Sequence, residues 1–142
     1  MIVFDTNVVS ELMKPQPDES VSDWVRAQTD GDLFTTSITL AEILYGIERL
    51  PDGKRKELLR TAASDVFAAF ADQVLPFDAV AAARYPTIVD IRERLGLPID
   101  GFDAQIASIC QTHRAGLATR NVKDFEHTGI VLTDPWRAQP RA

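Results

Sequence analysis

A chain of 142 residues has the length of one domain, and a domain of this size buries roughly 68–70% of the surface that its unfolded form exposes. Its 45% apolar and 25% charged residues are the composition of an ordinary globular protein. The formal net charge of -6 argues against a protein that binds nucleic acid non-specifically through a net positive charge. Acidity does not exclude a phosphodiester substrate, because bound divalent cations would invert the field of an acidic site.

Short apolar runs alternate with longer segments of helical periodicity along the chain. In chain order we expect a strand over 2–5, helices over 7–13 and 19–28, a strand over 33–36, helices over 38–50 and 54–73, a strand over 74–77, helices over 79–95 and 101–114, and strands over 117–119 and 130–133. Strands that alternate with helices predict an α/β fold with a parallel sheet covered on both faces. We expect a single domain over residues 1–136 and a frayed tail over 137–142.

The only cysteine, Cys110, lies on the apolar face of the helix predicted over 101–114, so we interpret it as a core residue. The sequence has no disulfide pair, no secretory leader and no long apolar span. It therefore predicts a cytoplasmic protein without a membrane contact.

Four acidic residues lie at or near junctions between predicted strands and helices: Asp5, Glu42, Asp103 and Asp124. In open α/β sheets ligands bind beyond the carboxyl ends of the strands, so we expect these acids to converge there. No cluster of histidines or cysteines accompanies them, and Mg²⁺ and Mn²⁺ select carboxylates. Because phosphodiester chemistry usually needs such an ion, the pattern indicates a nucleic-acid backbone as substrate.

Each acid also has a structural interpretation. Thr39 and Glu42 have the spacing of a capping box, in which Glu42 would bind the amide of Thr39. Asp5 fits an Asx turn or a helix N-cap, and Asp103 could complement the dipole of the helix that begins beside it. Asp124 fits a turn residue or a cap of the turn before Phe125.

Four segments occur in the order and with the gaps of one known family: 1–7 (MIVFDTN), 36–47 (TSITLAEILYGI), 100–107 (DGFDAQIA) and 118–125 (ATRNVKDF). They resemble the PIN-domain ribonuclease toxins called VapC, in the FitB-like branch. The closing run 132–136 (LTDPW) also resembles the end of that branch, so the resemblance extends over residues 1–136.

The resemblance implies a PIN-like three-layer sandwich with a central parallel sheet of about five strands. It implies a metal-dependent endoribonuclease that is the toxin of a type II toxin–antitoxin pair and hydrolyses RNA by a metal-activated water. Mg²⁺ is the expected cofactor, with Mn²⁺ as a substitute. The expected partners are an RNA such as transfer RNA, a cognate antitoxin and a second copy of the chain in a homodimer.

The predicted catalytic residues are Asp5, Glu42, Asp103 and Asp124, with Asp5 and Asp103 as the principal metal ligands. Many members of the family carry an acid where Asn121 stands in this chain. Either Asn121 or Asp124 therefore completes the site. Carboxylates in one crevice repel each other, so an empty site is expected to raise at least one pKa.

Five further residues are predicted to serve the site. Thr6 and Thr119 would orient the carboxylates by hydrogen bonds, and Asn121 would act beside them or through water. Arg120 and Lys123 flank the acids and would contact RNA phosphates, although both also fit ordinary surface charges.

Two other functions stay open on the sequence. A degenerate PIN module would keep the fold and bind a partner without catalysis, and the neutral Asn121 makes this conceivable. A phosphotransferase of the haloacid dehalogenase type also uses an aspartate after an N-terminal strand. That chemistry needs a second aspartate two positions later, where this chain has Asn7.

Overall fold

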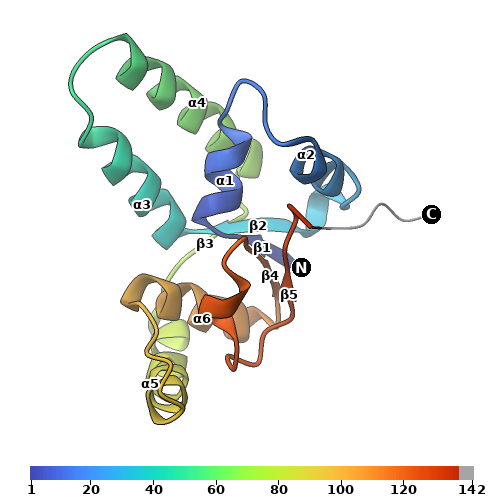
Figure 1. The fold of residues 1–142 in the computed structure, drawn as a ribbon, viewed down its shortest axis with the longest axis vertical. Helices are drawn as coiled ribbons and strands as arrows, with labels where there is room; N and C mark the ends of the chain where they lie inside the picture. The colour runs from blue at the N-terminus through green and yellow to red at the C-terminus, as the bar shows by residue number, and fades with distance from the viewer. Residues whose placement is uncertain (138–142) are drawn as a thin grey trace.

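The computed structural model describes residues 1–137, and its strands and helices follow the predicted order (Figure 1). The strands are β1 (Ile2–Phe4), β2 (Leu33–Thr36), β3 (Val74–Leu75), β4 (Gly116–Ala118) and β5 (Leu132–Thr133). The helices are α1 (Thr6–Leu12), α2 (Glu19–Arg26), α3 (Ser37–Glu48), α4 (Lys54–Phe70), α5 (Ala79–Arg94) and α6 (Gly101–His113), with short 3-10 helices η1 (Asp30–Asp32) and η2 (Val122–Phe125). Residues 138–142 of the tail predicted to fray lie outside the described part.

The five strands form one parallel sheet in the order β3-β2-β1-β4-β5. The chain therefore begins in the middle of the sheet, where Val3 pairs with Phe34 of β2 on one side and with Leu117 of β4 on the other. The order of the strands reverses between β1 and β4. Ligand sites of open α/β sheets lie beyond the carboxyl ends of the strands at such a point.

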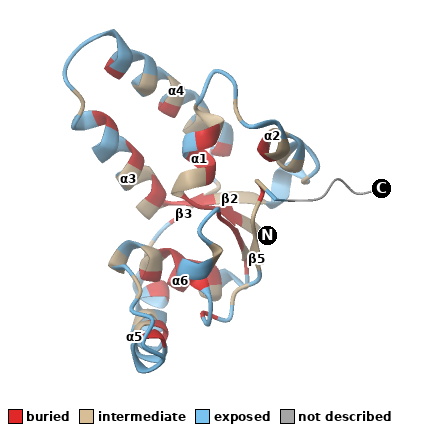
Figure 2. Cartoon of the chain, viewed as in Figure 1, coloured by how far each residue is buried: buried red, intermediate tan, exposed pale blue. Residues whose placement is uncertain are grey.

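Helices cover both faces of the sheet, as the sequence predicted, which gives three layers (Figure 1). Successive residues of β1 point to opposite faces, so Val3 belongs to the core with α5 and α6, whereas Phe4 belongs to the core with α1, α3 and α4. Cys110 is fully buried in the first of these cores, as expected. Figure 2 shows buried positions along the sheet and on the helix faces turned toward it. None of the helices in residues 1–137 has the length and apolar character needed to cross a membrane.

Helix α4 is three residues shorter than the sequence predicted. It ends at Phe70, because Ala71 takes a positive φ of 46° and turns the chain toward β3. Phe70 fills the core at this end, with its ring 5.8 Å from that of Phe4 in an edge-on arrangement. The ring of Trp24 from α2 lies 5.7 Å from that of Phe4. These contacts fix the layer of helices above the carboxyl half of β1.

Candidate active site

Asp5 directly follows β1 and is only 4% exposed. Its Oδ1 accepts a hydrogen bond from the amide of Val8 at 3.1 Å, which makes Asp5 the N-cap of α1. Its Oδ2 accepts a hydrogen bond from Thr119 Oγ1 at 2.5 Å. The structural interpretation of Asp5 as a cap is therefore right. The cap also holds a buried carboxylate at the carboxyl end of the central strand.

Thr119 directly follows β4, the neighbour of β1, and is fully buried. Its hydroxyl donates to Asp5 and accepts from the amide of Asn121 at 3.0 Å. A single side chain thus joins the ends of two adjacent strands and the start of η2. The parallel pairing of β1 with β4 brings these residues together although 114 positions separate Asp5 from Thr119.

Glu42 lies on α3 and is half-buried, with its Oε1 accepting a hydrogen bond from Thr6 Oγ1 at 2.9 Å. The predicted capping box is wrong. The N-cap of α3 is Thr36, whose hydroxyl accepts from the amide of Thr39 at 3.1 Å. The helix begins as soon as the chain leaves the extended conformation of β2, which places Glu42 in its second turn. Its carboxylate is therefore not used as a cap and is turned toward α1.

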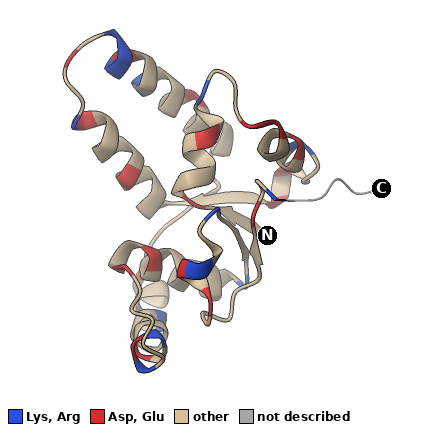
Figure 3. Cartoon of the chain, in the orientation of Figure 1, with Lys and Arg blue, Asp and Glu red and all other residues tan. Residues whose placement is uncertain are grey.

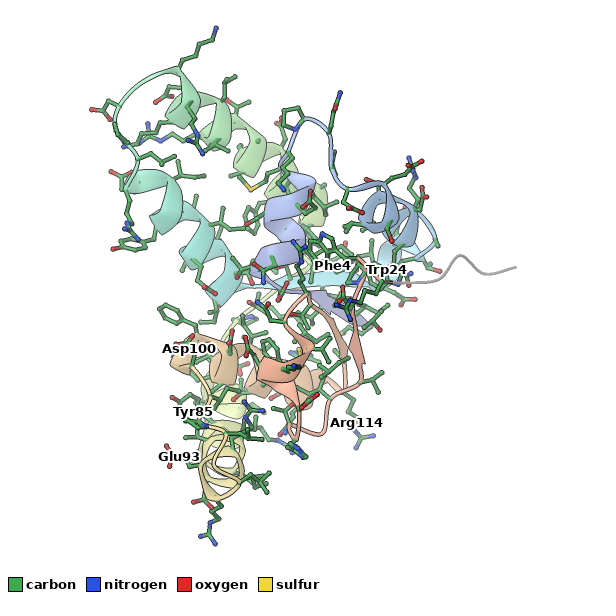
Figure 4. All side chains as sticks on the ribbon, in the orientation of Figure 1. Phe4, Trp24, Tyr85, Glu93, Asp100 and Arg114 are labelled. Atoms are coloured by element: carbon green, nitrogen blue, oxygen red, sulfur yellow. The ribbon has the colours of Figure 1, made fainter. Side chains whose placement is uncertain are left out.

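Asp103 is half-buried in the first turn of α6, where the dipole interpretation places it. Its pKa is nevertheless raised above the ordinary value of an aspartate, to about 7, and burial is the largest cause. Repulsion by four neighbouring carboxylates contributes the rest, in decreasing order Asp100, Asp124, Glu42 and Asp5. Asp100 was not among the predicted site residues. It occupies the N-cap position of α6 without a side-chain capping bond, and Figure 4 places it at the start of that helix, on the side of the sheet opposite Phe4 and Trp24.

Asp5 and Glu42 also have raised pKa values. The pKa of Asp5 is raised to about 6. Burial is the main cause and the charge of Glu42 a minor one, whereas the hydrogen bonds from Thr119 and from two backbone amides oppose the shift. Burial and the charge of Asp100 raise the pKa of Glu42 against the hydrogen bond from Thr6. The prediction of a raised pKa is confirmed. Its main cause is burial, however, and repulsion comes second.

The four predicted acids come from the end of β1, from α3, from α6 and from η2, and the charges of Asp124, Glu42 and Asp5 all act on Asp103. Figure 3 shows acidic positions on helices above and below the sheet. Within residues 1–137, acidic, histidine and cysteine side chains do not form a group of three that could hold a metal ion. Mg²⁺ usually needs only one or two protein carboxylates and keeps several waters. The donor set here consists of oxygen atoms, and its carboxylates have raised pKa values. A bound divalent cation would favour their charged forms, so the donor set fits such an ion.

Asn121 occupies the N-cap position of η2, and its carbonyl accepts the amide of Asp124 at 3.0 Å. Asp124 lies inside the short helix and is exposed, so the interpretation of Asp124 as a helix cap is wrong. Residues 120–124 line an open cleft of about 920 Å³ together with the C-terminal segment around Trp136. The guanidinium of Arg120 lies 5.1 Å from the centre of the Trp136 ring, and Lys123 lines the same cleft.

Residues 2–131 match the PIN domain. The chain belongs to the PIN domain family. It is 37% identical over 137 residues to the VapC ribonuclease Y4jK of Sinorhizobium fredii, covering 96% of this chain and 98% of that protein. It is 34% identical over 137 residues to the toxin FitB of Neisseria gonorrhoeae, covering 96% and 99%.

A solved structure has the same fold. The chain in the structure of FitAB bound to a DNA fragment superposes on this one with a TM-score of 0.91 and 33% identity, over 100% of both chains. The family resemblance and the PIN-like fold that the sequence predicted are therefore confirmed.

The raised pKa of Asp5 predicts a pH-dependent stability of the metal-free protein. In an unfolded chain an aspartate titrates near pH 4, so between about pH 4 and 6 the folded state binds more protons than the unfolded state, and stability falls as the pH rises. For Asp5 the loss corresponds to about 3 kcal/mol. In EDTA, the melting temperature of the wild type is expected to fall between pH 5 and pH 8 more steeply than that of Asp5→Asn.

The matched control is Asp78→Asn, because Asp78 also caps a helix through its side chain but its amide partner, Ala81, lies on α5. This variant should keep the slope of the wild type. Mg²⁺ should restore the melting temperature of the wild type at pH 8 and leave Asp5→Asn nearly unchanged. Equal slopes for wild type and Asp5→Asn would show that Asp5 is ionised in the folded protein at pH 5.

Proposed function

We propose that this PIN-domain chain is a divalent-metal-dependent endoribonuclease and the toxin of a toxin–antitoxin pair. The observation that carries the proposal is the convergence of Asp5, Glu42 and Asp103 at the switch point of the sheet, each with a raised pKa. The relatives named VapC ribonuclease and toxin FitB support the activity and the toxin role. A PIN module without catalysis is disfavoured, because the chain keeps all three of these acids.

In this proposal Asp5 and Asp103 hold Mg²⁺, for which Mn²⁺ substitutes, and Asp124 or Asn121 completes the site. When bound, the ion supplies a Lewis acid for phosphodiester hydrolysis. Thr119 fixes the rotamer of Asp5 through its hydrogen bond to Oδ2. Each carboxylate oxygen of Asp5 accepts one hydrogen bond and has a second lone pair that a metal ion can use, so capping and metal binding do not compete.

Glu42 and the basic residues of the cleft also have roles in the proposed reaction. Thr6 holds Glu42 through its hydrogen bond to Oε1, which leaves Oε2 for the site. Because its pKa is raised, Glu42 can accept a proton from an attacking water more readily than an ordinary glutamate. Arg120 and Lys123 line the cleft beside Asp124 and would bind the phosphates on one side of the bond that is cut.

The proposed partners follow from the family. The substrate class is RNA, with transfer RNA as the first candidate. The structure of FitAB, a two-protein assembly on DNA, supports a cognate antitoxin that holds this chain inactive. We also propose a homodimer as the state of the free toxin.

Purified, partner-free protein should cleave total RNA in Mg²⁺ and lose this activity in EDTA. Because water attacks phosphorus directly in metal-assisted hydrolysis, the products are expected to carry a 5′-phosphate and a 3′-hydroxyl. Mapping both ends by ligation with and without prior phosphatase treatment measures this. Ends with a 2′,3′-cyclic phosphate would instead mean that the 2′-hydroxyl is the nucleophile, and activity that persists in EDTA would remove the metal from the proposal.

A further inference from the structure

Arg92, in the last turn of α5, is a buried cation without a counter-charge. It is 4% exposed, and within residues 1–137 no carboxylate lies at ion-pairing distance from its guanidinium. Its Nη1 instead donates to two backbone carbonyls, of Glu126 at 2.8 Å and of Lys123 at 3.3 Å. Its buried Nε has no hydrogen-bond partner. Burying a charge and leaving one donor unsatisfied costs free energy, so packing alone does not explain an arginine here.

The two carbonyls that Arg92 binds lie on either side of Asp124 in the chain. Lys123 lies in η2, and Glu126 is the C-cap residue that directly follows η2. The end of a helix has carbonyls without intrahelical partners, and charge-assisted hydrogen bonds to them are stronger than neutral ones. One nitrogen of Arg92 therefore ties both ends of the segment that carries Asp124 to α5.

A second set of contacts holds the residues that follow. Thr128 Oγ1 donates to the carbonyl of Phe125, and Gln111 Nε2 of α6 donates to the carbonyl of Thr128 at 2.6 Å. Phe125 itself is buried in the core with α5 and α6. The backbone of the segment is thus bound to α5 and α6, whereas Lys123 and Asp124 line the open cleft.

We propose that Arg92 is a positioning residue for the nuclease site: by holding the carbonyls of Lys123 and Glu126, it fixes Asp124 in its place beside the other acids. This inference rests on the proposed function of the site. An arginine suits the role because its guanidinium carries several N–H donors in a rigid plane. A lysine ammonium ends one bond closer to the backbone, so it would reach these carbonyls less well.

The first test needs neither metal nor RNA. In metal-free protein, hydrogen exchange of the amides of residues 122–126 should be about tenfold or more faster in Arg92→Met than in the wild type, and intermediate in Arg92→Lys. Ile88→Val is the matched control, because Ile88 is also buried on α5, one helical turn before Arg92, and belongs to the core rather than to these hydrogen bonds. Exchange in Arg92→Met that matches the wild type or Ile88→Val would overturn the proposed hold on η2.

The second test asks whether the hold acts through Asp124. Arg92→Met should lower kcat for RNA cleavage by about 10–100-fold with little change in KM, and Arg92→Lys should recover part of the loss. Ile88→Val should stay within about twofold of the wild type. In an Asp124→Asn background, Arg92→Met should cost much less than it does alone, because the residue that it positions is already lost.

The results decide separately whether Arg92 acts through Asp124 and whether it holds η2. Wild-type kcat in Arg92→Met, or losses that multiply fully in the double variant, would show that Arg92 does not act through Asp124. If the wild type itself cleaves no RNA, the proposed function fails, and the exchange experiment still decides whether Arg92 holds η2.

Discussion

Asp103→Asn is expected to lower RNA cleavage by about 10²–10⁴-fold, which corresponds to several kcal/mol of lost transition-state stabilisation. The change keeps the shape of the side chain and removes its charge. Asp103 is half-buried among four other carboxylates, and in the proposed site it shares the metal ion with Asp5. The variant should nevertheless fold, since loss of a repelled carboxylate relieves the metal-free protein. Cleavage of a defined RNA in Mg²⁺, with Mn²⁺ binding measured by calorimetry, tests both statements.

Asp5→Asn and Glu42→Gln should behave in the same way as Asp103→Asn. Asp78→Asn is the matched control, because Asn caps a helix about as well as Asp and Asp78 caps α5 through its hydrogen bond from Ala81. It should keep wild-type activity. Full activity in any one of the three site variants would remove that residue from the site. Full activity in both Asp5→Asn and Asp103→Asn would end the proposal of a metal-dependent nuclease.

Expression of the chain without its partner is expected to arrest bacterial growth, and Asp5→Asn is expected to abolish this effect. An unrestrained endoribonuclease destroys RNA that translation needs, whereas a variant without the carboxylate of Asp5 keeps the fold but not the chemistry. Colony counts after induction, at protein levels matched by immunoblot, measure the difference. Asp78→Asn should arrest growth like the wild type.

A harmless wild type at a level where soluble protein accumulates would contradict the toxin role. If that protein also bound no Mn²⁺, the PIN module without catalysis would be the better description. Binding of Mn²⁺ and cleavage of RNA in vitro without growth arrest would keep the nuclease and reject only the toxin.

The sequence by itself determined the order of the elements and the family, and it singled out the acids that we propose for the site. Helical and strand periods differ, and most strands here are short apolar runs between polar turns, so local pattern was enough to place them. Asp5 could be singled out because a carboxylate at the end of a buried apolar run has few structural explanations. The four motifs supported the family together, since their order and gaps are more specific than any one of them.

Only the tertiary structure decided how these residues are held. Thr36 rather than Thr39 caps α3, because the cap is set where the chain leaves β2, and this depends on the pairing of the strand with its neighbours. Burial is the largest cause of the raised pKa of Asp103, and burial is set by tertiary packing, which a local sequence pattern does not record. The same reason hid Arg92, whose partners in η2 lie 31 and 34 residues away and are backbone carbonyls, which no side-chain pattern records.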